Sequence, residues 1–389
     1  MRILLASDSF KGTFSCFECD DMLAAAARSV FGDVECISVP IADGGEGTVR
    51  AVLSATGGKL VSVVVSGPLW HPVQSFYGKI DSAHAVIEMA AASGLPLVPA
   101  GMRNPVNTTT YGTGELIKAA VKDGCRDILI GLGGSATNDG GIGCLRALGV
   151  KFFDNDGNEL RGVGADLAHI VEIDVSGLRD TMQGVRITIM CDVSNPLCGE
   201  NGATCVFGPQ KGADAACVAG LERGMRNFKE RIISQFGINP DTIAGSGAAG
   251  GLGCALAVFL NAKVMSGIET ILRLSDFDRK AADSDFVVTG EGRVDSQSCH
   301  GKAICGIGTH CRMLGVPAVA LAGSSGEGAE EIFKYGISSL FIASPSGDNS
   351  WQVPANARAC YMAKAKEMFS IIESMMPLPG PANFLKNKP

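Results

Sequence analysis

The chain has 389 residues, of which 46% are hydrophobic and 19% are charged, so it is long enough for about two domains and too apolar for a disordered or fibrous protein. Its formal net charge of −7 offers no basic surface for nucleic acid or an anionic membrane, so an anionic ligand would have to be captured by local groups. The first residues become polar too early for a signal peptide, and no apolar run approaches the roughly 18 residues of a membrane span. We therefore expect a cytoplasmic protein.

The chain begins with a predicted strand, helix and strand at residues 2–6, 15–30 and 35–40. Ser15, with Glu18 three residues later, is typical of a helix start. Each strand then ends in a polar loop. Because ligands bind beyond the carboxyl ends of parallel strands, two such loops favour a binding site, although ordinary helix caps are the alternative for each loop. The loop residues are Asp8, Ser9 and Lys11 after the first strand, and Asp43, Gly44, Gly45 and Glu46 after the second.

Fourteen cysteines are scattered through apolar segments, which favours reduced thiols in the core. Cys16 and Cys19 form a CxxC pair, but no second pair follows at the spacing of a zinc site. We expect these two residues to lie on a helix.

The pattern changes near residue 60, where short alternating segments indicate a different, mixed domain. After residue 283 alternating strands and helices resume. We therefore predict an α/β protein of two domains, in which a discontinuous, doubly wound parallel-sheet (Rossmann-like) domain from residues 1–60 and 284–389 carries an inserted mixed α/β domain, residues 61–283. Three consecutive small domains are the alternative, but the two-stranded N-terminal unit would then lack enough sheet to be stable. Predicted strands lie at 60–65, 76–80, 85–89, 127–130, 186–191, 285–289, 318–322 and 338–343, predicted helices at 112–122, 139–148, 218–236, 250–260, 302–314, 327–335 and from 354, and a hairpin around 155–157.

A glycine-rich turn follows the buried strand at 127–130. Its glycines let backbone amides approach an anion, and the positive end of the following helix dipole favours one. The turn is therefore a candidate phosphate or carboxylate site, with a tight strand-to-helix connection as the alternative. Its residues are Gly133, Gly134, Ser135, Thr137, Asn138 and Asp139.

Four more polar segments follow strands or precede helices, and Arg103, Asp192, Lys211 and the segment 289–295 belong to them. Arg293 could instead form a surface ion pair with a neighbouring acid. Phosphoryl transfer needs such a mixture, because acids hold Mg²⁺ and take a hydroxyl proton while cations and amides neutralise the moving phosphate. The predicted set comprises Asp8, Asp43, Asp192, Glu291 and Asp295 as acids, with Lys11, Arg293 and Lys302 as cations.

The stretch 245–250 matches the dinucleotide pattern GxGxxG, but no convincing strand precedes it, so we reject a Rossmann dinucleotide site there. Glycines at this helix start, including Gly250 and Gly251, could hold a phosphate or allow close helix packing. The ordinary phosphate loop, the kinase signatures HRD and DFG, the GxSxG elbow and HExxH are all absent from the sequence.

In these motifs the chain resembles the bacterial glycerate kinase family, roughly from Ile3 to Ile371. So many matches in one order are not expected by chance. Ser7, where the family usually has proline, and the stretch 244–246 are small departures that affect turn rigidity. The matching segments are 8–12, 42–48, 67–69, 111–115, 133–141, 191–193, 195–199, 207–212, 247–253 and 289–292.

The resemblance implies ATP-dependent phosphorylation of D-glycerate to 2-phosphoglycerate or 3-phosphoglycerate, with ATP and Mg²⁺ bound in a cleft between two α/β domains. It implies small-molecule partners only, with a homodimer as one option. An NAD-dependent hydroxy-acid dehydrogenase and a non-catalytic sugar-acid binding protein remain alternatives. The predicted roles are Asp192 as base, Asp8 as second choice and Lys11 on phosphate; Ser9, Asp43, Gly44, Gly45, Arg103, Arg293 and Lys302 for substrate; Gly133, Gly134, Ser135, Thr137, Asn138, Gly250 and Gly251 for nucleotide; and Glu291 and Asp295 for Mg²⁺.

Overall fold

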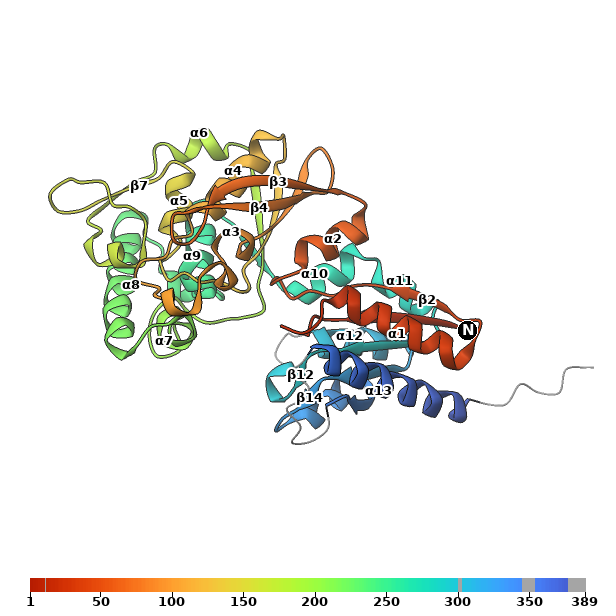
Figure 1. Ribbon diagram of the computed structural model, residues 1–389. Coiled ribbons are helices and arrows are strands. Elements are labelled where there is room, and N and C mark those ends of the chain that lie inside the picture. Colours follow the sequence, from red (N-terminus) through yellow and green to blue (C-terminus); the bar gives the residue numbers. More distant parts are fainter. Residues whose placement is uncertain (11, 300–302, 345–353, 377–389) are drawn as a thin grey trace, which may run out of the picture. The chain divides into compact units, whose positions relative to one another are not determined.

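The structure is a computed structural model that describes residues 1–10, 12–299, 303–344 and 354–376 (Figure 1). The chain divides into two compact units. The terminal unit contains Met1–Pro40, Asp278–Cys299 and Ile307–Pro389, and the inserted unit contains Ile41–Phe277 and His300–Gly306.

The terminal unit contains a five-stranded parallel sheet that combines both ends of the chain. Ile3 lies opposite Phe286 across the β1–β11 pair, so an N-terminal strand is hydrogen-bonded to one that comes more than half the chain later. In β1 and β11 the residues that point to either face of the sheet are buried, as expected for parallel strands covered on two sides. The predicted discontinuous parallel-sheet domain is thus confirmed. The strand order is β15-β13-β11-β1-β2, with β1 Arg2–Ser7, β2 Glu35–Ser38, β11 Phe286–Gly290, β13 Ala318–Ala322 and β15 Ile337–Ile342.

Two long helices cover one face of this sheet, α1 (Cys16–Phe31) and α13 (Pro354–Met375), which Figure 1 shows side by side. The predicted cap at the start of α1 is present, because the Ser15 side chain and the Glu18 side chain each bond the other residue's backbone N–H. Cys16 and Cys19 lie on α1 and are buried, and all fourteen cysteines are free thiols. The other elements of this unit are α11 Phe277–Ala282, β12 Arg293–Val294, η6 Ser296–Cys299, α12 Ala303–Leu314, β14 Ser324–Ser325 and η7 Ala329–Tyr335, the last being a 3₁₀ helix where an α-helix was predicted.

The inserted unit contains a mixed six-stranded sheet, as predicted. Its strands β5, β6, β9 and β10 are parallel, whereas β3, β4 and β5 form an antiparallel meander. The order is β10-β9-β6-β5-β4-β3, with β3 Lys59–Ser66, β4 Pro72–Lys79, β5 His84–Glu88, β6 Asp127–Gly131, β9 Arg186–Met190 and β10 Lys263–Met265.

A second, two-stranded sheet in this unit pairs β7 (Lys151–Phe153) with β8 (Glu172–Asp174), and Phe153 also bridges Glu159 across the turn where a hairpin was predicted. The core packs around Tyr77, Phe152 and Phe228. The helices are α2 Thr48–Thr56, α3 Ala90–Ser93, α4 Tyr111–Lys122, α5 Ile142–Ala147, α6 Leu178–Met182, α7 Ala203–Phe207, α8 Ala215–Phe236, α9 Ala248–Leu260 and α10 Gly267–Leu274, with short 3₁₀ turns η1 Leu95–Leu97, η2 Ala100–Met102, η3 Gly164–His169, η4 Pro209–Lys211 and η5 Pro240–Thr242.

The first boundary between the units differs from the predicted one at residue 60. It lies between Pro40 and Ile41, because α2 packs on β4 and β5 of the mixed sheet. The predicted return at residue 284 also differs slightly, since the terminal unit resumes at Asp278. The alternation of strands and helices at the start of the chain therefore continues across the boundary between the two units.

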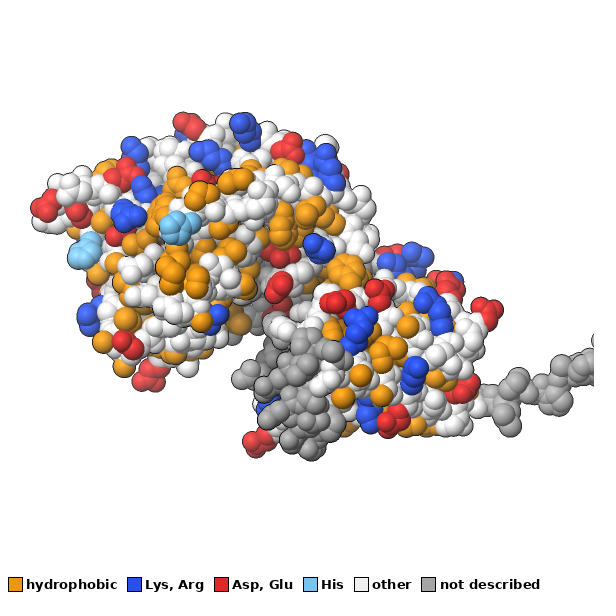
Figure 2. Space-filling model, viewed as in Figure 1, with side chains coloured by type: hydrophobic (Ala, Val, Ile, Leu, Met, Phe, Trp, Pro, Cys, Tyr) orange, Lys and Arg blue, Asp and Glu red, His pale blue; other side chains and the backbone are white. Residues whose placement is uncertain are grey.

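Within the described ranges, no helix is both long and apolar enough to cross a membrane. On the face shown in Figure 2, acidic and basic side chains are interspersed over the coloured surface of each unit.

Candidate functional site

The inserted unit brings two segments into backbone contact at the carboxyl end of its strand β6. The N–H of Gly133 donates to the carbonyl of Gly44 over 2.9 Å. A side chain at Gly131 would place its Cβ 2.3 Å from that carbonyl oxygen, so the acidic loop after β2 can approach β6 only because residue 131 is glycine. Two stretches that are far apart in sequence, 43–46 and 131–135, thus form one surface.

Asp192, which follows β9, has two differently held carboxylate oxygens. Its Oδ1 accepts hydrogen bonds of 2.8 Å from the Ser266 hydroxyl and from the Gly267 N–H at the start of α10. Its Oδ2 is buried and has no hydrogen-bond partner among the described residues. Burial, reinforced by the charges of Asp43 and Glu269, raises the pKa of Asp192 to about 6 despite the two hydrogen bonds. This carboxylate is suited to accept a proton near neutral pH.

Asp43 lies close to Asp192, although the strands that precede them belong to different sheets. A Cβ at Gly267 would lie 2.8 Å from Asp192 Oδ2 and 2.9 Å from the carbonyl oxygen of Asp43, so both acids border the same small space. Asp43 Oδ1 also accepts from the Gly45 N–H over 3.1 Å, which shapes the loop. The structure therefore groups Asp43, Gly44 and Gly45 with Asp192.

Glu88 holds the start of the helix that follows this acidic loop. It ends β5, is 4% exposed, and accepts a 2.6 Å hydrogen bond from the N–H of Val49 in the first turn of α2. Burial raises its pKa to about 7, against the lowering effect of the backbone donors. Glu88 thereby fixes the start of α2, which directly follows the loop that carries Asp43.

The glycine-rich turn after β6 has an outer and an inner half. Gly133 and Gly134 are at least partly exposed, whereas residues 136–141 are buried. Asn138 donates its side-chain amide to the Thr204 hydroxyl over 3.0 Å, so its amide serves the interior of the unit. The outer half, around the exposed Gly134, is therefore the part of the turn that can meet a ligand, and Ser135 lies at its buried edge.

Asp139 lies wholly inside this turn and does not start a helix. Gly140 and Gly141 have φ angles of 64° and 77°, so α5 begins only at Ile142, three residues later than predicted. The Asp139 carboxylate accepts from the N–H and the hydroxyl of Thr110, each at 2.8 Å. Burial raises its pKa. Asp139 thus joins the turn to the start of α4.

Gly250 and Gly251 pack against the inner half of the same turn. The N–H of Gly140 donates to the Gly250 carbonyl over 2.9 Å, and a Cβ at residue 250 would lie 2.1 Å from the Thr137 carbonyl oxygen. Both glycines are buried. These contacts agree with the alternative in which the glycines of this GxGxxG-like stretch allow close helix packing. Arg103 is exposed beyond η2.

The terminal unit gathers a second group of predicted residues at the ends of β1 and β11. Because these strands are parallel neighbours, the N–H of Asp8 donates to the Gly290 carbonyl over 2.9 Å. Asp8 is 6% exposed, and its Oδ1 accepts from the Ser9 N–H over 2.6 Å. Asp8 thus lies beside the residue that precedes Glu291.

Ser298 joins the two acids that were predicted to bind Mg²⁺. Its hydroxyl donates to Glu291 and accepts from the Asp295 N–H over 3.2 Å. Arg293 pairs with Asp295 at 3.3 Å, so the ion-pair alternative for this arginine is present. Lys11, His300 and Lys302 lie outside the described residues.

The donor chemistry of Glu291 and Asp295 fits Mg²⁺, which prefers oxygen ligands and is commonly bound by one or two carboxylates together with phosphates. A cage of three or more His, Cys, Asp or Glu side chains is not found within the described ranges. The two carboxylates are therefore suited to a metal that arrives with a phosphate ligand.

Comparison with known proteins gives the family. The model of the Glycerate kinase family matches residues 3–373. The chain belongs to the glycerate kinase family. It is 44% identical to "Glycerate kinase" of Bacillus subtilis over 89% of this chain and 91% of that protein, and 43% identical to "Glycerate 2-kinase" of Escherichia coli over 88% and 90%. The crystal structure of a Salmonella typhimurium LT2 protein assigned as glycerate kinase 2 matches with a TM-score of 0.82 at 38% identity, covering 96% of this chain and 98% of that one. The resemblance and the kinase class predicted from the motifs are confirmed.

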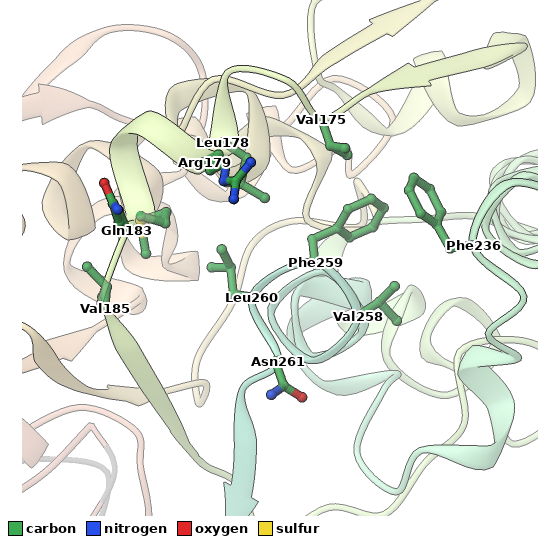
Figure 3. A pocket seen from close by; sticks show the side chains of 11 residues that line it. Val175, Leu178, Arg179, Gln183, Val185, Phe236, Val258, Phe259, Leu260 and Asn261 are labelled. Carbon is green, nitrogen blue, oxygen red and sulfur yellow. The ribbon is translucent and has the colours of Figure 1, made fainter.

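This member of the glycerate kinase family also has an apolar pocket of about 440 Å³ at the opposite end of the mixed sheet (Figure 3). Val185, which precedes β9, lines it together with Phe236 and Phe259, whereas Asp192 follows the other end of β9. A five-residue strand spans about 17 Å. The pocket is therefore a different place from the polar site.

Sequence reasoning did not find Glu88, Ser266, Gly267 or Ser298. Ser266 is 74 residues from Asp192, and Glu88 is 39 residues from Val49. Only Glu88 gave a signal, as an acid at the end of a predicted buried strand.

Proposed function

We propose that this protein transfers the γ-phosphate of ATP to a hydroxyl of D-glycerate and releases a phosphoglycerate and ADP. The observation that carries the proposal is the half-buried carboxylate of Asp192, with one oxygen anchored by Ser266 and Gly267 and the other without a hydrogen-bond partner in the described part of the chain. The relatives named glycerate kinase and glycerate 2-kinase support glycerate as the acceptor.

In this proposal Asp192 is the base, and Asp8 stays the second choice. The glycerate hydroxyl gives its proton to Asp192 Oδ2 while its oxygen bonds to the γ-phosphorus, and the bond to the bridging oxygen breaks to release ADP. The hydrogen bonds to Oδ1 fix the direction of Oδ2. Asp43 and the amides of Gly44 and Gly45 then border the acceptor.

Nucleotide phosphates would meet the outer half of the turn at Gly133, Gly134 and Ser135, where Gly134 is exposed and its backbone has no side-chain cover. The Gly133 N–H bonds the Gly44 carbonyl, so the phosphate would meet the N–H groups of the two residues that follow. Thr137 and Asn138 would act from inside the turn, by shaping it. We assign Ser9, Arg103 and Arg293 to substrate anions, and the same role to Lys11 and Lys302.

Glu291 and Asp295 would hold Mg²⁺ in the terminal unit, with Ser298 orienting both. The metal, when bound, neutralises phosphate charge.

Fourteen free thiols support a reducing compartment such as the cytoplasm.

The direct test is to incubate the protein with ATP, Mg²⁺ and D-glycerate and to identify the product by ³¹P NMR. We expect ADP and one phosphoglycerate. The phosphorus couples to a single proton in 2-phosphoglycerate and to a methylene pair in 3-phosphoglycerate, so a doublet or a triplet identifies the hydroxyl. ADP formation that does not depend on glycerate, or no turnover, would contradict the proposal, and glycerate-dependent reduction of NAD would favour a dehydrogenase.

The rate should depend on pH through Asp192. With a pKa of about 6 the base is protonated at lower pH and cannot accept the hydroxyl proton. We expect kcat/KM for glycerate, at saturating ATP and excess Mg²⁺, to fall about tenfold per pH unit below about pH 6. A profile that is flat between about pH 5 and about pH 8 would exclude Asp192 as the base.

A further inference from the structure

Lys211 is a cation that the proposed chemistry does not use, although it lies directly behind the glycine-rich turn. It ends the short turn η4 and is 2% exposed. Its ammonium donates to the Thr137 carbonyl over 2.7 Å. Among the described residues this carbonyl is its single hydrogen-bond acceptor, and no carboxylate lies within ion-pair distance.

Such a placement costs free energy. A buried ammonium loses its hydration, and one carbonyl does not replace it. Burial accordingly lowers the pKa of Lys211 to about 7, while the nearby charge of Asp139 opposes this shift. An apolar side chain of similar length would fill the same space without this cost, so the position of the ammonium calls for another reason.

The backbone of the turn provides that reason. Backbone hydrogen bonds anchor it from Gly133 to Gly44, from Leu95 to Gly134, from Ala136 to Ser93 and from Gly140 to Gly250, each at 2.9 Å. The side chains of Asn138 and Asp139 add bonds to Thr204 and Thr110. Between residues 136 and 140, the Thr137 carbonyl is held by a side chain from a segment 74 residues away. Lys211 is therefore the side chain that holds the backbone carbonyl of residue 137, in the inner half of the turn.

The segment that carries Lys211 is itself fixed. Gly212 follows it with a φ of 96°, and a Cβ there would lie 2.3 Å from the Arg103 carbonyl oxygen. The ammonium thus connects the loop at Arg103 with the turn after β6. Displacing it would shift the inner half of the turn and, with it, the backbone of the outer half at Gly133–Ser135.

We propose that Lys211 is a positioning residue for nucleotide binding, which sets the geometry of the Gly133–Ser135 amides by holding the Thr137 carbonyl from behind. This inference rests on the proposed function and adds a residue that does not touch the substrate.

The test compares Lys211→Met with the wild-type protein. Met removes the donor and keeps the volume, and it removes the cost of a buried charge, so we expect the melting temperature to stay unchanged or to rise. We expect KM for ATP to rise on the order of tenfold, with KM for glycerate changed less than about twofold. Binding of Mg²⁺-ADP, measured by calorimetry, should weaken by a similar factor, which gives a readout that needs no turnover.

Lys229→Met is the matched control, because the Lys229 ammonium bonds the Asp241 carboxylate, which lies in the same unit and outside the turn. It should leave both KM values unchanged. Lys211→Gln keeps an N–H donor at shorter reach and should restore part of the nucleotide affinity. An unchanged KM for ATP in folded Lys211→Met would overturn the inference, as would failure of both Lys211 variants to fold while Lys229→Met folds. Absence of turnover in the wild-type protein would instead contradict the proposed function.

Discussion

Asp192→Asn should reduce kcat by a factor on the order of 10² to 10⁴, the range by which a positioned general base accelerates proton transfer. Asn keeps an oxygen that can accept from Ser266 and Gly267, so the local geometry has a replacement for Oδ1. It removes the basic oxygen that has no partner. Because the pKa of Asp192 is raised in the folded protein, ionising this carboxylate destabilises the fold, and the variant should melt no lower than the wild type.

Asp156→Asn is the control for Asp192→Asn, since it makes the same chemical change in an exposed turn of the inserted unit. It should retain full activity. Asp8→Asn tests the second choice in the terminal unit. If Asp192→Asn and Asp8→Asn both retained near-normal kcat with ATP and glycerate, the assignment of the base would be wrong.

Gly267→Ala should lower kcat/KM on the order of a hundredfold without removing any functional group. The added Cβ would lie 2.8 Å from Asp192 Oδ2 and 2.9 Å from the Asp43 carbonyl oxygen, closer than carbon and oxygen can approach. Either acid must move, and the hydrogen bond from the Gly267 N–H to Asp192 moves with them. The measurement is kcat/KM for glycerate, beside a thermal melt to show that the variant is folded.

Gly101→Ala is the matched control, because a Cβ there meets no atom within 4 Å and its φ is not positive. Alanine also has the better helix propensity, by about 1 kcal/mol, so helix propensity cannot explain a loss of activity at residue 267. Wild-type activity in Gly267→Ala would show that the space between Asp43 and Asp192 relaxes freely, and that their precise separation does not matter for turnover.

The fold could be predicted from the sequence to the extent that local patterns encode it. Strands such as β1 and β13 are apolar runs buried on both faces, and α1 carries a complete capping box at Ser15. The position of the first boundary between the units, predicted near residue 60, was harder to derive from the sequence. The assignment of α2 depends on its packing against β4 and β5 and on the bond between Glu88 and Val49, which no local pattern contains.

The sequence predicted the candidate site as a set of loops at strand ends. In the structure, the residues of these loops differ in how deeply they are buried. Ser135, Thr137 and Asn138 looked equivalent in the sequence, yet Thr137 and Asn138 are fully buried, and the Asn138 amide donates to Thr204 in the interior. Gly250 and Gly251, predicted to bind a nucleotide or to allow close packing, lie against Thr137 and Gly140. In the local sequence, a hydroxyl or glycine that binds a ligand looks the same as one that packs in the interior. Only burial in the folded protein distinguishes the two roles.

The sequence by itself determined the element types, the two-unit α/β architecture and the kinase class, because periodicity, turn chemistry and motif order are local properties of the chain. Only the tertiary structure decided which polar groups meet. Asp192 is oriented by Ser266, and Thr137 is held by Lys211, each across 74 residues. Such pairings arise when strands and helices pack, and packing also determines the desolvation that raises the pKa of Asp192 and lowers that of Lys211.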